Sequence, residues 1–209
     1  MKYGITKTEY QVELEKLPFF NKATAGILLQ KDGVNLDRKL ERLTASGDFL
    51  RLKRGLYTTK MYYLTASNKD DYLTKVAGGL YYPSYLSVEY VLAKKGLIPE
   101  AISVYTSVTT KTTRGFNNFL GRFRYQNINP RLFLGFSDSE ATTAKALFDY
   151  LYLKTNLSTN LNSELAEGLR INWGQFTPSD FSEFNQYVKL AQSPKMTKIA
   201  KIIGDILKI

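Results

Sequence analysis

Residues 33–57, GVNLDRKLERLTASGDFLRLKRGLY, decide the fold predicted for the N-terminal part of this chain. Three leucines follow the i, i+4, i+7 spacing of one helix face: Leu36, Leu40 and Leu43. This spacing predicts a helix with a buried stripe. Asn35 is expected to cap its start, because the side-chain oxygen can accept a backbone N–H there. The helix is expected to run to about Ser46.

The opposite face of this predicted helix is basic. At about 100° per residue, Arg38, Arg42 and Ala45 fall away from the leucine stripe, and Lys39 sits beside them. Gly47 follows where a left-handed residue commonly ends a helix. The helix therefore pairs an apolar side with a positively charged one.

A basic hairpin is predicted directly after this helix. Leu50 and Leu52 alternate with Arg51 and Lys53, which is the period of a strand with one buried face. Arg54-Gly55 supplies a turn, and Leu56 and Tyr57 then begin a returning strand.

Two more helices are predicted upstream. The first covers Thr8–Leu17 and ends at Pro18, because proline disfavours helix at the residue before it. The second is capped by Asn21 and runs to Leu29, and Lys31–Gly33 forms a tight turn after it. Three helices followed by a basic hairpin indicate a winged helix-turn-helix over residues 1–60.

This layout predicts DNA binding. The third helix would enter the major groove, where Arg38 and Arg42 reach base edges or phosphates. The hairpin would lie along the DNA backbone or in the minor groove. Phosphate contacts would supply most of the affinity, and base contacts would supply the specificity. The candidate DNA-binding residues are Asn35, Arg38, Lys39, Arg42, Arg51, Lys53 and Arg54. Two alternatives stay open: a solvated basic face, since Asp37 and Glu41 share the helix, and a protein–protein adaptor.

Composition limits the function classes. The 209 residues are 44% hydrophobic, which is enough for one large or two modest domains. No apolar run approaches 18 residues and the start MKYGITKTEY is polar, so a cytoplasmic protein is expected. The chain contains no cysteine and no histidine, which excludes disulfides, thiolate metal sites and histidine-based catalysis.

Charge also favours a nucleic-acid or acidic partner. The net charge is +10, and the first 60 residues carry 12 basic against 7 acidic side chains. The alternative to a nucleic-acid or acidic partner is that this charge simply keeps the protein soluble. No nucleotide-binding or nucleophile motif is present, so neither an enzymatic activity nor a cofactor is expected. Asp138 and Glu140 are spaced like magnesium ligands of a nucleic-acid enzyme, but more plausibly favour the start of the next helix.

Residues 61–209 are predicted to form an α+β domain with a small sheet and covering helices. Thr58–Asn68 is expected to hold the end of the wing and a short linker, and Lys111–Gly115 a polar connection. The expected strands are Ile102–Thr109, Asn118–Ile128 and Arg131–Phe136. The expected helices are Tyr72–Leu80 (capped by Asn68 or Asp70), Tyr85–Lys94 (capped by Ser84), Ala141–Lys154, Glu164–Ile171 and Pro178–Gln192.

Three surface features of this domain remain open. Four arginines are expected around the sheet: Arg114, Arg122, Arg124 and Arg131. They form either a surface for nucleic acid or an acidic partner, or an ordinary solvated sheet face. The amphipathic segment Lys195–Ile209 would bind a membrane or a partner, or more ordinarily dock on its own domain. Five tyrosines near the linker are expected to pack between the domains: Tyr62, Tyr63, Tyr81, Tyr82 and Tyr85.

Several segments resemble the AbiEi antitoxin family of the type IV AbiE abortive-infection systems. Phe20–Tyr57, ending in LRLKRGLY, resembles the winged-helix domain of that family. Further matching segments are YPSYLS (82–87), GLIPE (96–100), LGRFRY (120–125) and AKAL (144–147) followed by Asp149. They extend the resemblance over about residues 5–155. This chain has Thr143-Ala144 where the family usually has Pro-Glu, so no role is assigned to that glutamate.

The resemblance implies two functions. One is autorepression, through an operator with an inverted repeat. The other is neutralisation of a nucleotidyltransferase-like toxin, without a requirement for a stable complex. No short motif transfers the toxin-neutralising residues. A regulator or adaptor without a toxin remains the alternative.

Overall fold

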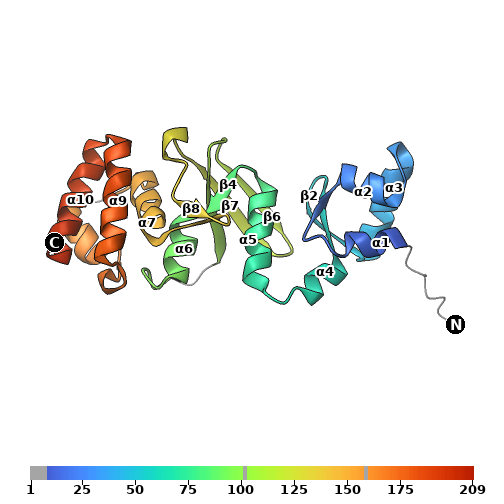
Figure 1. The fold of residues 1–209 in the computed structure, drawn as a ribbon, viewed down its shortest axis with the longest axis horizontal. Helices are drawn as coiled ribbons and strands as arrows, with labels where there is room; N and C mark the ends of the chain where they lie inside the picture. Colours follow the sequence, from blue (N-terminus) through green and yellow to red (C-terminus); the bar gives the residue numbers. More distant parts are fainter. Residues whose placement is uncertain (1–8, 101–102, 158–159) are drawn as a thin grey trace. The chain divides into compact units, whose positions relative to one another are not determined.

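The computed structural model describes residues 9–100, 103–157 and 160–209 as a mixed α+β protein, as predicted. The chain divides into two compact units. The first runs to Leu80 and includes Phe116–Leu120, and the second comprises Tyr81–Gly115 and Gly121–Ile209. Figure 1 shows the course of the chain through these elements.

The first unit combines five helices of the described residues with a three-stranded sheet of order β1-β3-β2. Its helices are α1 (Glu9–Leu14), α2 (Lys22–Leu29), α3 (Gly33–Ala45), α4 (Lys60–Thr65) and α5 (Lys69–Leu80). Its strands are β1 (Phe20–Asn21), β2 (Phe49–Lys53) and β3 (Leu56–Thr59), and all its strand pairs are antiparallel.

The core of this unit is built largely from the predicted apolar residues. The α3 leucines Leu36, Leu40 and Leu43 are buried, together with Leu14 of α1. Rings from β1 and β2 close the cluster, with the centroids of Phe20 and Phe49 5.0 Å apart. The periodicity of residues 33–45 therefore identifies the buried side of α3 correctly.

The start of α3 differs from the prediction. Asp32, not Asn35, occupies the N-cap position, and the helix begins at Gly33. Gln30 ends α2 in the left-handed conformation (φ 52°), so only two residues are needed before the next helix. Gly33 takes a φ of +47°, which a residue without Cβ adopts at little cost.

The first helix is shorter than predicted. Thr8 lies outside the described residues, and α1 ends at Leu14 instead of Leu17. The next three residues form tight turns, in which Leu17 N donates to Leu14 O at 3.2 Å. Pro18 explains this end, because it disfavours helical backbone at Leu17.

A register shift modifies the predicted alternation in the hairpin. The pairing of β2 with β3 is irregular between Arg51 and Lys53. As a result Phe49 and Leu52 are buried, Leu50 is half-buried and Arg51 is exposed. Such a bulge bends the strand and redirects its side chains.

The predicted linker at residues 58–68 is instead partly helical. Thr59 caps α4 by accepting a hydrogen bond from Tyr62 N, and Asn68 caps α5 by accepting from Asp70 N and Asp71 N. The Tyr62 ring centroid lies 5.6 Å from that of buried Tyr72. The predicted domain boundary at residues 60/61 thus falls inside the first unit, since α4 packs on α5.

A second sheet has six strands in the order β6-β7-β5-β4-β9-β8, and all of them except residues 116–118 of β6 belong to the second unit. Its strands are β4 (Ser84–Leu86), β5 (Val104–Thr109), β6 (Arg114–Asn118), β7 (Gly121–Asn127), β8 (Phe136–Ser137) and β9 (Glu140–Ala141). The pairs β5–β7 and β4–β9 are parallel, and β4–β5 and β8–β9 are antiparallel.

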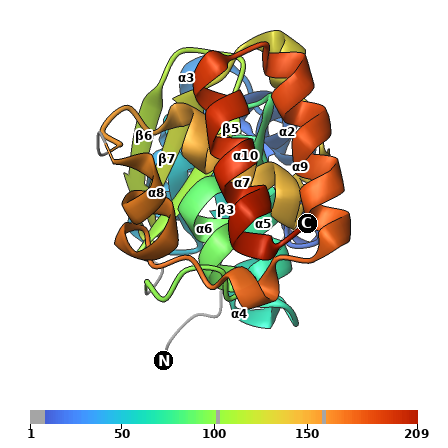
Figure 2. The same ribbon diagram turned by 90° about the vertical axis from the view of Figure 1, so that its left-hand side faces the viewer.

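Helices cover this sheet. The longer ones are α6 (Val88–Lys94), α7 (Thr143–Leu153), α9 (Pro178–Ala191) and α10 (Pro194–Leu207). Shorter turns are η1 (Pro130–Leu132), α8 (Leu161–Ser163), the π-helical η2 (Glu164–Gly168) and η3 (Trp173–Gln175). Figure 2 shows α9 and α10 as neighbouring helices, and α9 in turn packs on α7.

Several predicted boundaries in this unit are wrong. Ser84–Leu86 is a strand, because these buried residues pair with Ser107–Thr109 of β5, and the following helix starts only after Ser87. Of the predicted strand 118–128, Asn118 is the last residue of β6, Phe119-Leu120 form a turn, and β7 covers Gly121–Asn127. Of the predicted strand 131–136, only Phe136 lies in a strand, and the first two residues belong to the turn η1, which Asn129 caps. Position 102 lies outside the described residues.

The later helices follow the prediction more closely. The α7 helix begins at Thr143 because Thr142 caps it, accepting from Lys145 N. A reciprocal capping box between Thr177 and Asp180 starts α9. The segment predicted as 164–171 is helical only to Gly168. None of the helices in the described ranges is long and apolar enough to cross a membrane.

Candidate nucleic-acid interface

The outward side of α3 is basic, as its periodicity predicts. Arg38, Arg42 and Ala45 are exposed on the side away from the buried leucines, and Lys39 is half-buried beside them. Helix α3 is fixed from behind by its apolar stripe, so these side chains start from a rigid base. The arrangement offers positive charge and hydrogen-bond donors to a partner.

Positive charge is concentrated at this helix and the turn before it. The pKa of the Lys39 ammonium is lowered, first by partial burial and then by the nearby charges of Arg42 and Lys31. Asp48 opposes this shift. Like charges held this close repel one another, and a bound anion would relieve that repulsion.

One acidic side chain of α3 is already neutralised. The Asp37 carboxylate lies 2.5 Å from the Lys22 ammonium at the start of α2, and both side chains are about half exposed. Asp37 therefore detracts less from the basic face than the sequence suggests. Glu41 is exposed on the same helix.

The hairpin presents two of its three predicted basic side chains to solvent. Arg51 and Arg54 are exposed, and Gly55 forms the turn with a φ of +75°. Lys53 is engaged elsewhere: its ammonium donates to the Leu80 carbonyl at 2.6 Å. The same ammonium lies 5.7 Å from the centre of the Phe116 ring.

The Phe116–Leu120 segment adds a second contact to the hairpin. The Asn118 amide donates from Nδ2 to the Leu52 carbonyl at 3.1 Å. Together with Lys53, this bond ties β2 to its own unit. Lys53 thus serves packing in this structure, and sequence reasoning had no signal for so distant a partner.

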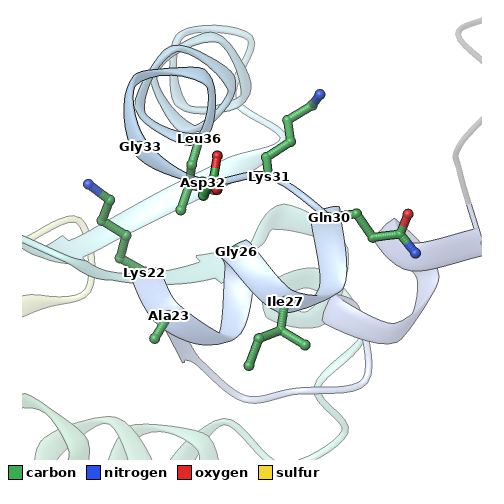
Figure 3. A pocket seen from close by; sticks show the side chains of 9 residues that line it. All are labelled: Lys22, Ala23, Gly26, Ile27, Gln30, Lys31, Asp32, Gly33 and Leu36. Carbon is green, nitrogen blue, oxygen red and sulfur yellow. The ribbon is translucent and has the colours of Figure 1, made fainter.

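A groove of about 570 Å³ lies between α2 and the start of α3 (Figure 3). Lys22 and Lys31 lie on two sides of it, with Gly26 between them. Its lining residues are Lys22, Ala23, Gly26, Ile27, Gln30, Lys31, Asp32, Gly33 and Leu36. The sequence prediction did not include the two lysines, because they fall outside the third helix and the hairpin.

The arginines of the second unit are exposed as predicted. Arg122 and Arg124 alternate along β7 with Phe123 and Tyr125, both of which are buried. Arg114 and Arg131 are also exposed. Arg124 lines a cavity of about 330 Å³ that contains Glu89 and Glu100 as well, so its surroundings are of mixed charge.

The AKAL segment followed by Asp149 forms a buried polar cluster. Lys145 and Asp149 are an i, i+4 ion pair on α7, and both side chains are fully buried. Asp149 Oδ2 also accepts from Tyr85 OH at 3.0 Å and from Ser87 Oγ at 2.7 Å. The Lys145 ammonium lies 5.3 Å from the ring centre of Tyr187.

Burial dominates the electrostatics of this cluster. It lowers the pKa of Lys145 and raises that of Asp149, and their mutual attraction opposes both shifts. Burial also raises the pKa of Tyr85. With no exposed side-chain surface, the pair cannot meet a ligand, and its role in this structure is to hold α7 against the sheet.

The two carboxylates considered as magnesium ligands lie apart from any larger acidic group. Asp138 is exposed, and Glu140 forms an ion pair with Lys94 at 2.6 Å. Within the described ranges, no cluster of three or more metal-binding side chains occurs. The helix start that they precede is capped by Thr142.

The five tyrosines of residues 62–85 are divided between the two units. Tyr62 and Tyr63 pack on Tyr72 in the first unit. In the second unit, Tyr81 packs on Tyr125, and Tyr85 packs on Phe133 and Phe136. Tyr82 is 76% exposed.

Comparison with known proteins adds no relative: neither a protein-family model nor a curated protein matches this chain.

Proposed function

We propose that this protein is a DNA-binding transcriptional repressor whose first unit is a winged helix-turn-helix. The observation that carries the proposal is the outward face of α3. It presents Arg38 and Arg42 opposite a buried leucine stripe, with Lys39 beside them. A positively charged helix face on a rigid support is what major-groove binding requires.

The other elements have roles in the same complex. The turn from α2 to α3 brings Lys31 beside the groove at the start of α3, where it neutralises a phosphate, whereas Lys22 is paired with Asp37. The hairpin formed by β2 and β3 places Arg51 and Arg54 against the phosphates of the DNA backbone. Lys53 is omitted from the proposed contacts, because the Leu80 carbonyl holds its ammonium.

The resemblance to the AbiEi family extends the proposal to a toxin partner. The protein acts as an antitoxin that represses its own operon from an inverted repeat and counteracts a nucleotidyltransferase-like toxin in the cytoplasm. The matches at residues 20–57 and in four later segments support this assignment. Co-expression with such a toxin, encoded beside its gene, should restore growth, and continued growth arrest would leave only the DNA-binding function.

DNA binding is tested by titrating the full chain onto a labelled duplex from just upstream of its own gene. A scrambled duplex of equal length is the control, and both are measured across a salt series. We expect tight binding to the upstream duplex that weakens steeply with salt. Equal affinity for both duplexes would contradict a repressor and favour an adaptor that binds protein.

A further inference from the structure

Val34 stands out on the proposed reading helix. It lies in the first turn of α3 and is 64% exposed. At about 100° per residue, Val34 and Arg38 are about 40° apart on the helix, so they share the face opposite the leucine stripe. An exposed valine therefore stands at the N-terminal end of a largely basic face.

The position of Val34 matters more than its exposure. Single exposed apolar residues are common, and Ile27 of α2 is 77% exposed in the same unit. In helix-turn-helix complexes, however, the N-terminal residues of the recognition helix contact base edges. Val34 occupies that part of α3, one turn before Arg38.

The major groove offers one apolar group for such a side chain. Thymine carries a C5-methyl group there, whereas the other bases present only hydrogen-bond donors and acceptors. We propose that Val34 determines sequence specificity by packing on a thymine methyl beside the base pair that Arg38 contacts. This inference rests on the proposed DNA-binding function and deepens it.

The experiment starts with selection of preferred duplexes from a random library by the full chain. Each thymine of the selected duplex is then replaced by deoxyuracil, which removes the methyl group and keeps the hydrogen-bonding groups. Replacing the thymine that Val34 contacts in one half-site should weaken binding about fourfold, the factor expected for burying one methyl-sized group, and replacing it in both half-sites about sixteenfold. The Val34→Ala variant should be insensitive to the same replacement.

Leu64→Ala is the matched control, because it also shortens an exposed aliphatic side chain in the first unit (61% exposed) and lies outside both α3 and the groove. It should remain as sensitive to deoxyuracil as the unaltered protein. Circular dichroism melting should be unchanged in both variants, since neither side chain is buried.

The outcomes separate this inference from the function beneath it. The full chain could select a preferred duplex that the Arg38→Ala variant no longer prefers, while no thymine methyl affects binding through Val34. That result would overturn this inference and leave the proposed function standing. Methyl sensitivity that persists in Val34→Ala would overturn it as well. Failure to enrich any sequence would overturn both the inference and the proposed function.

Discussion

Lys145 and Asp149 carry opposite charges inside the second unit with no exposed side-chain surface. Removing two charges from water is costly, and their attraction offsets that cost only when hydrogen bonds satisfy the remaining polar atoms. Tyr85 and Ser87 supply such bonds to the Asp149 carboxylate. The pair therefore depends on all its partners being present.

We predict that Lys145→Met destabilises the protein by about 3–5 kcal/mol, because it leaves a buried carboxylate without its cation. Urea unfolding, monitored by circular dichroism, gives the free energy of unfolding of each variant. The double variant Lys145→Met/Asp149→Leu should recover much of the loss, since no charge remains buried. A single variant that unfolds like the unaltered protein would contradict the role given to this pair.

Sequence periodicity predicted the long elements well. The leucines of α3 and the start of α9 were located correctly, because amphipathic spacing and caps act locally. The exposure of Arg38 and Arg42 follows from the same local pattern, because the leucines on the opposite side of the helix are buried.

Short elements were predicted poorly, because distant contacts decide them. Ser84–Leu86 becomes a strand only through pairing with residues more than twenty positions away in β5. The sequence predicts Lys53 to be a DNA-contacting residue of the wing, yet its ammonium donates a hydrogen bond to the Leu80 carbonyl. No local pattern in the sequence reports either partner.

The hairpin arginines should act through phosphates and not through base identity. Each phosphate contact contributes about 0.9 to the slope of log affinity against log salt. We predict that Arg51→Gln/Arg54→Gln reduces the magnitude of that slope by about 2. It should weaken binding to the upstream and the scrambled duplex by the same factor. Fluorescence anisotropy across a salt series measures both effects.

Arg122→Gln/Arg124→Gln is the matched control, since it also removes two exposed arginines from a strand region. It should leave the salt slope unchanged. A slope lowered by the control but not by the hairpin variant would move the DNA-binding surface to the second unit.

The C-terminal helix α10 is anchored in its own unit. Met196, Ile199 and Ile203 are fully buried, whereas Ile209 beyond the helix is 59% exposed. This burial accounts for the amphipathic pattern of residues 195–209 through docking within the unit.

Ile203→Ala should therefore cost about 2–5 kcal/mol, and Ile209→Ala less than about 0.5 kcal/mol. Thermal and urea unfolding measure the difference. If Ile203→Ala left stability unchanged but reduced binding to anionic lipid vesicles, the helix would serve a membrane instead.

At the scale of the whole molecule, the net charge of +10 favours association with nucleic acid in general. Charge alone gives no preference among sequences, because phosphate contacts carry no sequence information directly. We assign the preference for one DNA sequence to the outward face of α3. Substitutions in the hairpin should therefore change the affinity for every duplex, whereas substitutions on α3 should change the preference for one duplex over another.

The most direct test compares Arg38→Ala/Arg42→Ala with Arg122→Ala/Arg124→Ala on the upstream and scrambled duplexes at one salt concentration. Both variants lose two exposed arginines, so their net charges are equal. We expect the α3 variant to lose its preference for the upstream duplex and the β7 variant to keep it. Preference retained by the α3 variant would contradict the claim that this helix reads DNA.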